Sequence, residues 1–442
     1  MKKIYRILLA GILAGMLFAS SVQASVVDNG AVYPISSNSI EEWPQGPDIY
    51  GETAVLMNAD TGAILYNKGM NEKRYPASIT KIMTCLLALE HSGLDEQVTF
   101  TETCLADQAA GSGNIGMQVG EVLTMKQCLL ALMIQSANDV ATQIAEHVAG
   151  SVSTFADMMN QKAQELGCSN THFVNASGMP DDNHYTTAYD MALIFREAIK
   201  NDTFREIIGT QSFTLQATNM NPESRTFTTH HPLVAQTAPE YYEGCFGGKT
   251  GITNAARSTL VSGAERNGTT LIAVTLRADL GELCQDQIKL FDYGFNNFQR
   301  VEVPGGCVTI PNGKDISELK VVETVSGEVT AESYFYKEDY FVGSGIKQEV
   351  TPEAEPQVMK PTESGEEQTG EEISEEAQGE QEDAGNSQLS EKEKEKADQE
   401  LKGIYKYIIY VLAGFIGVAL IISGGSALRR KKKRKRRRKR RK

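Results

Sequence analysis

Residues 75–91, YPASITKIMTCLLALEH, combine the start of a predicted helix with a pair of reactive side chains. The apolar residues of this stretch recur at helical spacing, which predicts a helix over 78–91: Ile82, Cys85, Leu86 and Leu89. Ser78 and Lys81 lie three residues apart and therefore on one face of that helix. A serine becomes a nucleophile when a neighbouring base takes its proton. A lysine can be that base when burial or a nearby cation lowers its pKa.

The Ser78–Lys81 spacing also has an ordinary interpretation. Ser-x-x-Lys arises by chance roughly once or twice in a chain of this composition, and the lysine can be a solvated residue at a helix N-terminus. Pro76 and Ala77 favour a helix that begins at Ser78. The backbone N–H of Ser78 would then be free to bind a developing oxyanion.

The patterns on both sides of this stretch predict an α+β fold. Helical spacing recurs in 125–135, 139–148, 152–166, 187–200 and 288–296. Strand-like runs lie before and after these helices, as a hairpin at 52–66 and as strands at 212–215, 225–230, 258–263 and 270–276. Strands from both chain ends that enclose helices predict an antiparallel sheet with flanking helices and an inserted helical subdomain. Residues 301–345 form a small β-like appendix.

A second polar motif, Ser136-Ala137-Asn138, lies between two predicted helices. In a loop, a hydroxyl and an amide at positions i and i+2 can point into one cleft, where they would relay a proton and orient a substrate. The alternative is structural, because Ser and Asn are favoured N-cap residues before a helix such as 139–148. Both interpretations stay open on this motif alone.

A third motif lies within residues 247–253, GGKTGIT. Glycines beside a strand allow a ligand to approach the backbone closely, and Lys249 and Thr250 can bind a carboxylate by charge and hydrogen bond. A strand end with a turn is the structural alternative. The phosphate-loop pattern GxxxxGK[ST] is absent.

The three motifs in this order resemble the signature set of penicillin-binding proteins and serine β-lactamases. The surrounding sequence resembles the D-alanyl-D-alanine carboxypeptidases, the low-molecular-mass penicillin-binding proteins. The segments that carry this resemblance are YPAS at 75–78, FVNASGM at 173–179 and HYTTAYDM at 184–191. The resemblance covers about residues 45–300 and implies a β-lactamase/DD-peptidase-like fold.

The resemblance implies three catalytic residues. Ser78 would attack the carbonyl between two terminal D-alanines, neutral Lys81 would take its proton, and Ser136 would relay a proton to the leaving D-alanine. The expected substrate is a peptidoglycan stem peptide that ends in D-Ala-D-Ala, and β-lactam antibiotics are expected covalent inhibitors.

The resemblance also implies the substrate-binding residues. Asn138 would position the peptide amide and Thr250 would bind the terminal carboxylate. Lys249 would help to keep Lys81 unprotonated, and Gly251 completes the motif. The backbone N–H of Ile252 would hold the oxyanion together with that of Ser78.

The sequence departs from the family at this third motif. An aromatic or histidine residue usually follows Lys-Thr-Gly, whereas here Ile252 follows it. Ala256-Arg257 stands where an Ala-Gly pair is usual. These two positions leave substrate fit at this strand open.

Three other functions share parts of the pattern. A serine β-lactamase needs a deacylating base, usually in an ExxLN-like loop, which is absent between Ser136 and Lys249. A DD-endopeptidase acting on cross-links would use the same residues, and a non-enzymatic penicillin sensor would keep the motifs without activity. No cofactor and no metal are expected, because the six histidines show no HxxxH or HxxEH spacing and CxxC is absent.

The two ends of the chain predict a membrane-anchored, extracytoplasmic enzyme. Residues 1–24 read as a signal peptide, although a first transmembrane helix is the alternative, and 25–44 as a leader segment. Residues 404–422 are long and apolar enough to span a bilayer. The basic tail at 423–442 is expected to lie on the cytoplasmic side, near membrane lipid, and a nucleic-acid-binding arm is the disfavoured alternative.

Charge and cysteine content describe the part outside the membrane. Fourteen consecutive basic residues close the chain, so the remaining sequence carries a net charge of −28. Much of this charge lies in residues 346–402, which are expected to form an extended acidic tether. The seven cysteines are irregularly spaced and are expected to be buried structural residues.

Overall fold

The computed structural model describes residues 32–108, 112–326, 329–337 and 339–347. The predicted signal peptide, span and basic tail lie outside these residues, as does the tether beyond Lys347. Within the described ranges, no helix combines the length and the apolar character that a bilayer crossing requires.

The main sheet has five antiparallel strands in the order β2-β1-β9-β8-β7. Two strands come from the start of the fold and three from after the helices: β1 (Thr53–Asn58), β2 (Ile64–Lys68), β7 (Cys245–Thr253), β8 (Arg257–Arg266) and β9 (Thr269–Ala278). This arrangement confirms the predicted α+β class. The third motif lies on β7, an edge strand of this sheet.

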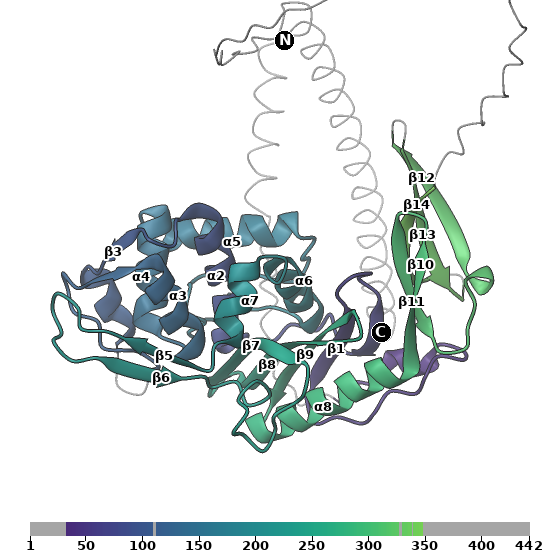
Figure 1. Ribbon diagram of the computed structural model, residues 1–442, viewed down its shortest axis with the longest axis horizontal. Helices are drawn as coiled ribbons and strands as arrows, with labels where there is room; N and C mark the ends of the chain where they lie inside the picture. The colour runs from purple at the N-terminus through teal and green to yellow at the C-terminus, as the bar shows by residue number, and fades with distance from the viewer. Residues whose placement is uncertain (1–31, 109–111, 327–328, 338, 348–442) are drawn as a thin grey trace, which may run out of the picture. The chain divides into compact units, whose positions relative to one another are not determined.

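The chain between β2 and β7 forms the helical part, which contains two small two-stranded sheets (Figure 1). Its α-helices are α2 (Lys81–His91), α3 (Met125–Ile134), α4 (Asn138–Ala149), α5 (Val152–Glu165), α6 (Ala188–Ala198) and α7 (Asp202–Gly209). The small sheets pair β3 (Gln97–Thr99) with β4 (Val122–Thr124) and β5 (Ser212–Leu215) with β6 (Arg225–Thr228). Short 3-10 turns lie at Ser36–Ser39, Ala77–Thr80 (η2), Glu102–Asp107 (η3) and Ile316–Glu318.

Helices cover both faces of the main sheet, and strand β1 shows how. Val55 and Met57 belong to the hydrophobic core shared with the helical part. Ala54 and Leu56 point to the other face, into the core that contains α8 (Leu280–Asn297). Alternate residues of a strand face opposite sides, and because both faces of β1 are buried, its four central residues are all apolar. Figure 1 shows α8 and the helical part on opposite sides of this sheet.

A second antiparallel sheet follows α8, with the strand order β10-β11-β14-β13-β12. Its strands are β10 (Phe298–Val303), β11 (Gly306–Pro311), β12 (Lys320–Ser326), β13 (Val329–Tyr336) and β14 (Tyr340–Lys347). The β-like appendix predicted at 301–345 is therefore a sheet that spans 298–347. The last two residues of β14 lie in the range that the sequence assigns to the tether.

The segment before β1, predicted to be a leader, packs into the fold where it is described. Trp43 is buried, and its ring centroid lies 5.0 Å from that of Phe298 and 4.8 Å from that of Tyr340. Its Nε1 donates to the carbonyl of Leu65 at 3.0 Å. Trp43 therefore packs between the main sheet and the second sheet.

Helix boundaries differ from the prediction in three places. A 3-10 turn at Ala77–Thr80 precedes α2, so the α-helix begins at Lys81 rather than at Ser78. Helix α8 begins at Leu280, well before residue 288, behind a capping box of Asp279 and Glu282. Helix α7 was not predicted, and its N-cap is Asn201.

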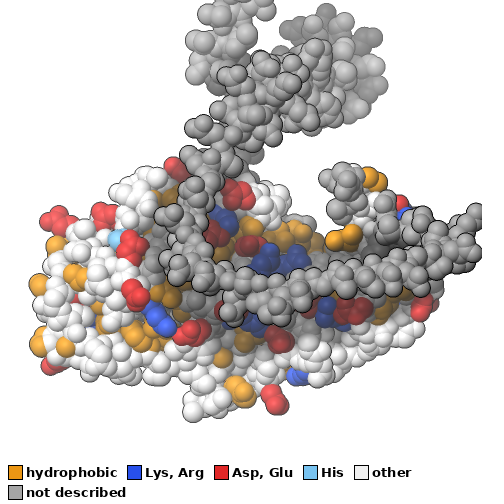
Figure 2. Space-filling model, turned by 45° about the horizontal axis from the view of Figure 1, so that its top comes forward, with side chains coloured by type: hydrophobic (Ala, Val, Ile, Leu, Met, Phe, Trp, Pro, Cys, Tyr) orange, Lys and Arg blue, Asp and Glu red, His pale blue; other side chains and the backbone are white. Residues whose placement is uncertain are grey.

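All seven cysteines are buried, as predicted, and carry free thiols. Acidic and basic side chains are scattered over the face that Figure 2 shows, without one dominant charged patch.

Candidate active site

The 3-10 turn at the start of α2 aims Ser78 and Lys81 at each other. Lys81 Nζ lies 3.0 Å from Ser78 Oγ, within hydrogen-bond distance. The lysine side chain is fully buried, at 0% exposure. The alternative of a solvated lysine at an ordinary helix start is therefore wrong.

Lys81 Nζ has two further partners, and they fix its orientation. It donates to Asn138 Oδ1 and to the carbonyl of Ser177, both at 2.6 Å. A neutral amine has two N–H donors and one lone pair, so these two acceptors leave the lone pair for Ser78. Burial, and then the charge of Lys249, hold the pKa of Lys81 well below its usual value. The amine is therefore suited to accept a proton from Ser78.

The Ser136–Asn138 turn contributes its amide directly. Ser136 adopts a left-handed conformation with φ of +61°, and Asn138 is the first residue of α4. The N-cap of α4 is Ala137, without a side-chain capping bond, so the N-cap interpretation of this motif is wrong. Among the described residues, the Ser136 hydroxyl has no hydrogen-bond partner, so it is not hydrogen-bonded to Lys81 or Ser78.

Strand β7 brings the third motif against the 3-10 turn Ala77–Thr80, which carries Ser78 and is called the nucleophile's turn below. A Cβ added at Gly251 would lie 2.8 Å from the backbone nitrogen of Ser78 and 2.5 Å from Thr259 Oγ1. Only glycine therefore allows β7 to pack so closely. Thr259, on β8, also donates to the carbonyl of Pro76 at 2.8 Å, which ties the turn to the sheet.

The remaining residues of the third motif differ in exposure. Lys249 is buried, its Nζ donates to the carbonyl of Thr250 at 2.9 Å, and burial lowers its pKa to about 7. Thr250 is half-buried. Ile252 is 73% exposed, so this position of the motif is open to solvent.

The chain enters the nucleophile through a constrained turn. Ala77 has a φ of +51°, in the left-handed region that costs an L-residue roughly 1–2 kcal/mol. Its carbonyl lies against Gly178, where an added Cβ would approach to 1.9 Å. Gly178 itself has a φ of +87°. Strain of this kind often accompanies a functional site, where surrounding contacts maintain it.

The loop before β4 supports the Ser136–Asn138 turn. The backbone N–H of Asn138 donates to the carbonyl of Gly113 at 2.7 Å. The buried carboxylate of Asp139 accepts from the backbone N–H groups of Ile115 and Met117, at 3.3 and 3.1 Å. Burial raises the pKa of Asp139, and these hydrogen bonds oppose that rise.

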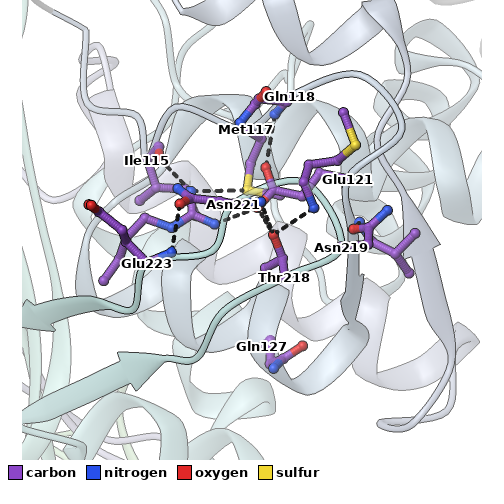
Figure 3. Close-up of polar contacts among 12 residues, drawn as sticks. Ile115, Met117, Gln118, Glu121, Gln127, Thr218, Asn219, Asn221 and Glu223 are labelled. Atoms are coloured by element: carbon purple, nitrogen blue, oxygen red, sulfur yellow. Dashed lines mark hydrogen bonds and ion pairs between the residues drawn. The ribbon is translucent and has the colours of Figure 1, made fainter.

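A buried ion pair fixes the other side of this loop. Glu121 is fully buried and pairs with Arg225 of β6 at 2.5 Å. Arg225 also donates to the carbonyl of Ile115 at 2.9 Å. The Thr218 hydroxyl and the backbone N–H of Gln118 donate to the same Glu121 carboxylate, at 2.7 and 3.0 Å (Figure 3). The β5–β6 hairpin therefore holds the loop that supports Asn138.

Arg257 stands where the family usually has glycine, and its backbone conformation is one that suits glycine. Arg257 adopts a φ of +54°, a conformation that glycine adopts without strain. Its guanidinium pairs with Asp279 at 2.9 Å on the surface. The chain thus keeps the left-handed turn that the usual glycine would favour.

Three contributors to the site were not identified from the sequence. They are the Ser177 carbonyl, Gly178, and the hydrogen bond between Thr80 Oγ1 and His184 Nε2 at 2.8 Å. All three loop residues lie in segments noted only for their family resemblance. The part of the chain that the structure describes contains no cluster of three or more His, Cys, Asp or Glu residues able to hold a metal ion.

Comparison with protein families gives a match to the D-alanyl-D-alanine carboxypeptidase model of peptidase family S11 over residues 40–280. The chain is 34% identical over 251 residues to D-alanyl-D-alanine carboxypeptidase DacF of Bacillus subtilis, covering 56% of this chain and 63% of that protein. It is 33% identical over 258 residues to DacB2 of Mycobacterium tuberculosis, covering 57% of this chain and 84% of the relative.

Solved structures give the same result. The Streptomyces K15 DD-transpeptidase superposes with a TM-score of 0.54 at 30% identity, covering 57% of this chain and all of that one. Penicillin-binding protein 5 from Haemophilus influenzae superposes with a TM-score of 0.59 at 25% identity, covering 69% of this chain and 97% of that one. The chain therefore belongs to peptidase family S11, the serine-type D-alanyl-D-alanine carboxypeptidases among the low-molecular-mass penicillin-binding proteins.

Proposed function

We propose that this chain removes the terminal D-alanine from peptidoglycan stem peptides through an acyl-enzyme on Ser78. The observation that carries this proposal is the buried Lys81 amine, which lies 3.0 Å from Ser78 Oγ and is held by two acceptors. A base so placed can activate a serine, which is otherwise a weak nucleophile.

In the acylation step, Lys81 Nζ accepts the proton of Ser78 as Oγ bonds to the carbonyl carbon between the two D-alanines. The oxyanion is held by the backbone N–H groups of Ser78 and Ile252. The close packing of Gly251 on the Ser78 nitrogen brings these two segments together. Collapse of the tetrahedral intermediate breaks the C–N bond and leaves an ester on Ser78.

In the same step the departing D-alanine takes up a proton. Lys81 releases it, and Ser136 relays it to the leaving amine. Asn138 orients the peptide amide while its Oδ1 anchors Lys81. Thr250 binds the terminal carboxylate, near the positive charge of Lys249.

Deacylation completes the cycle. Water attacks the ester carbon, which restores the Ser78 hydroxyl and releases the shortened peptide. A β-lactam enters by the same attack on its ring amide, and the resulting penicilloyl ester on Ser78 is expected to be long-lived. Rapid hydrolysis of this ester would instead indicate a serine β-lactamase.

The sequence supports a place for this reaction outside the membrane. The signal peptide at 1–24, the apolar segment at 404–422 and the basic tail after it agree on one topology. The acidic residues of 348–402 would hold the enzyme away from the bilayer by mutual repulsion. Membrane lipid is thus a partner of the tail, and the cell wall is the site of action. Externally added protease should degrade the catalytic part in intact cells, whereas its full protection would contradict this topology.

The test of the activity is release of D-alanine by the full chain from a diacyl-Lys-D-Ala-D-Ala peptide, with and without prior penicillin. We expect release that penicillin abolishes. Mass spectrometry of digested muropeptides then separates loss of one D-alanine from cleavage of cross-links. Cross-link cleavage without D-alanine release would identify an endopeptidase. If neither product forms, the non-enzymatic penicillin sensor is the remaining alternative.

A further inference from the structure

The third residue of the Ser78–Lys81 turn makes a buried hydrogen bond that the catalytic cycle above does not use. Thr80 is fully buried, and its Oγ1 lies 2.8 Å from Nε2 of His184, which is itself only 1% exposed. The two residues are 104 positions apart. This contact therefore joins the nucleophile's turn to a distant loop.

The other ring nitrogen of His184 determines the direction of this hydrogen bond. Nδ1 accepts from the backbone N–H of Val174 at 3.1 Å. A neutral imidazole that accepts at Nδ1 carries its proton on Nε2. The ring must therefore donate to Thr80 Oγ1. Phe173 packs edge-on against the ring, at 5.6 Å between centroids, and keeps it in place.

The segment that begins at Val174 also supplies the pocket of the lysine base. The Ala176 carbonyl accepts from Thr84 Oγ1 at 2.7 Å, and the Ser177 carbonyl accepts from Lys81 Nζ at 2.6 Å. His184 thus links the two segments that hold Lys81, the start of α2 and the 174–178 loop.

We propose that His184 is a positioning residue, whose neutral ring locks Thr80 to the 174–178 loop and so aligns the Lys81 amine with Ser78. This inference rests on the proposed role of Lys81 as the base. His184 stays neutral across the working range, because burial lowers its pKa to about 3. The groups that act on it are Asp181, which opposes this shift, and His172 and Lys81, which add to it.

His184→Asn tests the hydrogen bond to Thr80. An asparagine Oδ1 can replace Nδ1 as the acceptor for Val174 but leaves Thr80 without its donor. We expect the rate of penicillin acylation by the full chain to fall about tenfold or more, because small displacements of a reacting group are costly. Thr80→Val removes the other end of the bond and should give the same loss, while Thr80→Ser keeps the hydroxyl and should retain wild-type rates.

The pH dependence of acylation separates positioning from a loss of fold. A loosened pocket admits water, so the pKa of Lys81 rises. The acidic limb of the pH–rate profile for acylation should therefore move to higher pH, by at least about half a unit. The other groups that act on Lys81 are Lys249, Asp107 and Asp139, which the variants leave in place. His172→Asn is the matched control, because the His172 ring is hydrogen-bonded to the Asn183 carbonyl, at 2.7 Å, and not to Thr80. This variant should leave both the acylation rate and the acidic limb of its pH profile unchanged.

Two further readouts complete the test. The double variant His184→Asn/Thr80→Val should be no more than about twofold slower than the slower single variant, since both remove one interaction. Nitrogen-15 NMR of the wild type should show His184 with its proton on Nε2. An unchanged acidic limb in both single variants, additive losses, or a proton on Nδ1 would overturn the proposal. A Lys81→Ala variant that still acylates would refute the role of Lys81 instead, independently of the NMR result.

Discussion

Gly178→Ala places a methyl group where the structure has no room for it. The added Cβ would lie 1.9 Å from the carbonyl oxygen of Ala77, whereas real Cβ contacts essentially never fall below 3.0 Å. One of the two segments must therefore move by about 1 Å. Either movement would disturb a catalytic group. Ala77 directly precedes Ser78, and the carbonyl of Ser177, next to Gly178, accepts a hydrogen bond from Lys81.

The expected magnitudes follow from this geometry. The φ of +87° at Gly178 costs an alanine roughly 1–2 kcal/mol, and overpacking adds about 1–3 kcal/mol. We expect the free energy of unfolding to fall by about 2–5 kcal/mol. A shift of about 1 Å would lengthen the contact between Lys81 Nζ and the Ser177 carbonyl beyond hydrogen-bond distance. Acylation should then slow by roughly 10²-fold.

Urea unfolding and the rate of labelling by a fluorescent penicillin measure the two effects. Gly167→Ala is the control, because Gly167 has a similar φ of +81° but nothing within 4 Å of an added Cβ. This variant should lose only the cost of the left-handed conformation, roughly 1–2 kcal/mol, and should label at the wild-type rate. If Gly178→Ala behaves like Gly167→Ala in both measurements, the packing of the 174–178 loop on the nucleophile's turn does not govern acylation.

Three further changes have defined outcomes. Folding lowers the pKa of Lys249 from 10.5 to about 7, so the unfolded chain binds more protons between these values and the wild type gains stability as pH rises through this window. Lys249→Met should therefore be more stable than the wild type below pH 7, by up to about 5 kcal/mol, and in thermal melts this advantage should vanish above pH 10.5. Arg225→Met leaves the Glu121 carboxylate buried without its partner and should lower the free energy of unfolding in urea by about 3–5 kcal/mol. Thr259→Val removes the hydrogen bond to the Pro76 carbonyl, so the free energy of unfolding should fall by about 1–3 kcal/mol and acylation should slow; an unchanged acylation rate would show that the tether to β8 does not position Ser78.

The local part of the site could be predicted from the sequence because it depends on short spacings. Ser78 and Lys81 are three residues apart, and any helical turn, 3-10 or α, brings them together. The order of the three motifs then predicted that Asn138 and Lys249 lie near this pair. The hydrogen bond from Lys81 to Asn138 and the burial of Lys249 agree with that prediction. Ser136 stays a prediction as a proton relay, because its hydroxyl has no partner among the described residues.

The backbone contributors could not be predicted in this way. The Ser177 carbonyl carries no residue signature, since any amino acid has the same acceptor. The left-handed conformations of Ala77 and Ser136 contradict their local preferences and exist because tertiary contacts impose them. His184 reaches Thr80 only through the fold of a loop, which no periodic pattern describes.

The fold was predicted better in its class than in its boundaries. Strand β7 contains Gly247, Gly248 and Gly251, which have low strand propensity. The strand forms because β8 and the nucleophile's turn pack against it more closely than side chains would permit. At α8, the capping pair Asp279 and Glu282 marked the true start, but the apolar pattern becomes continuous only later.

The site of penicillin attachment tests the central claim most directly. The full chain is incubated with penicillin, digested with a protease, and the adduct is located by mass spectrometry. We expect one penicilloyl group on Ser78 in the wild type, and no adduct in either Ser78→Ala or Lys81→Ala when both variants retain the wild-type melting transition. An adduct on any other residue, or undiminished labelling of a folded Ser78→Ala variant, would contradict the assignment of Ser78 as the nucleophile.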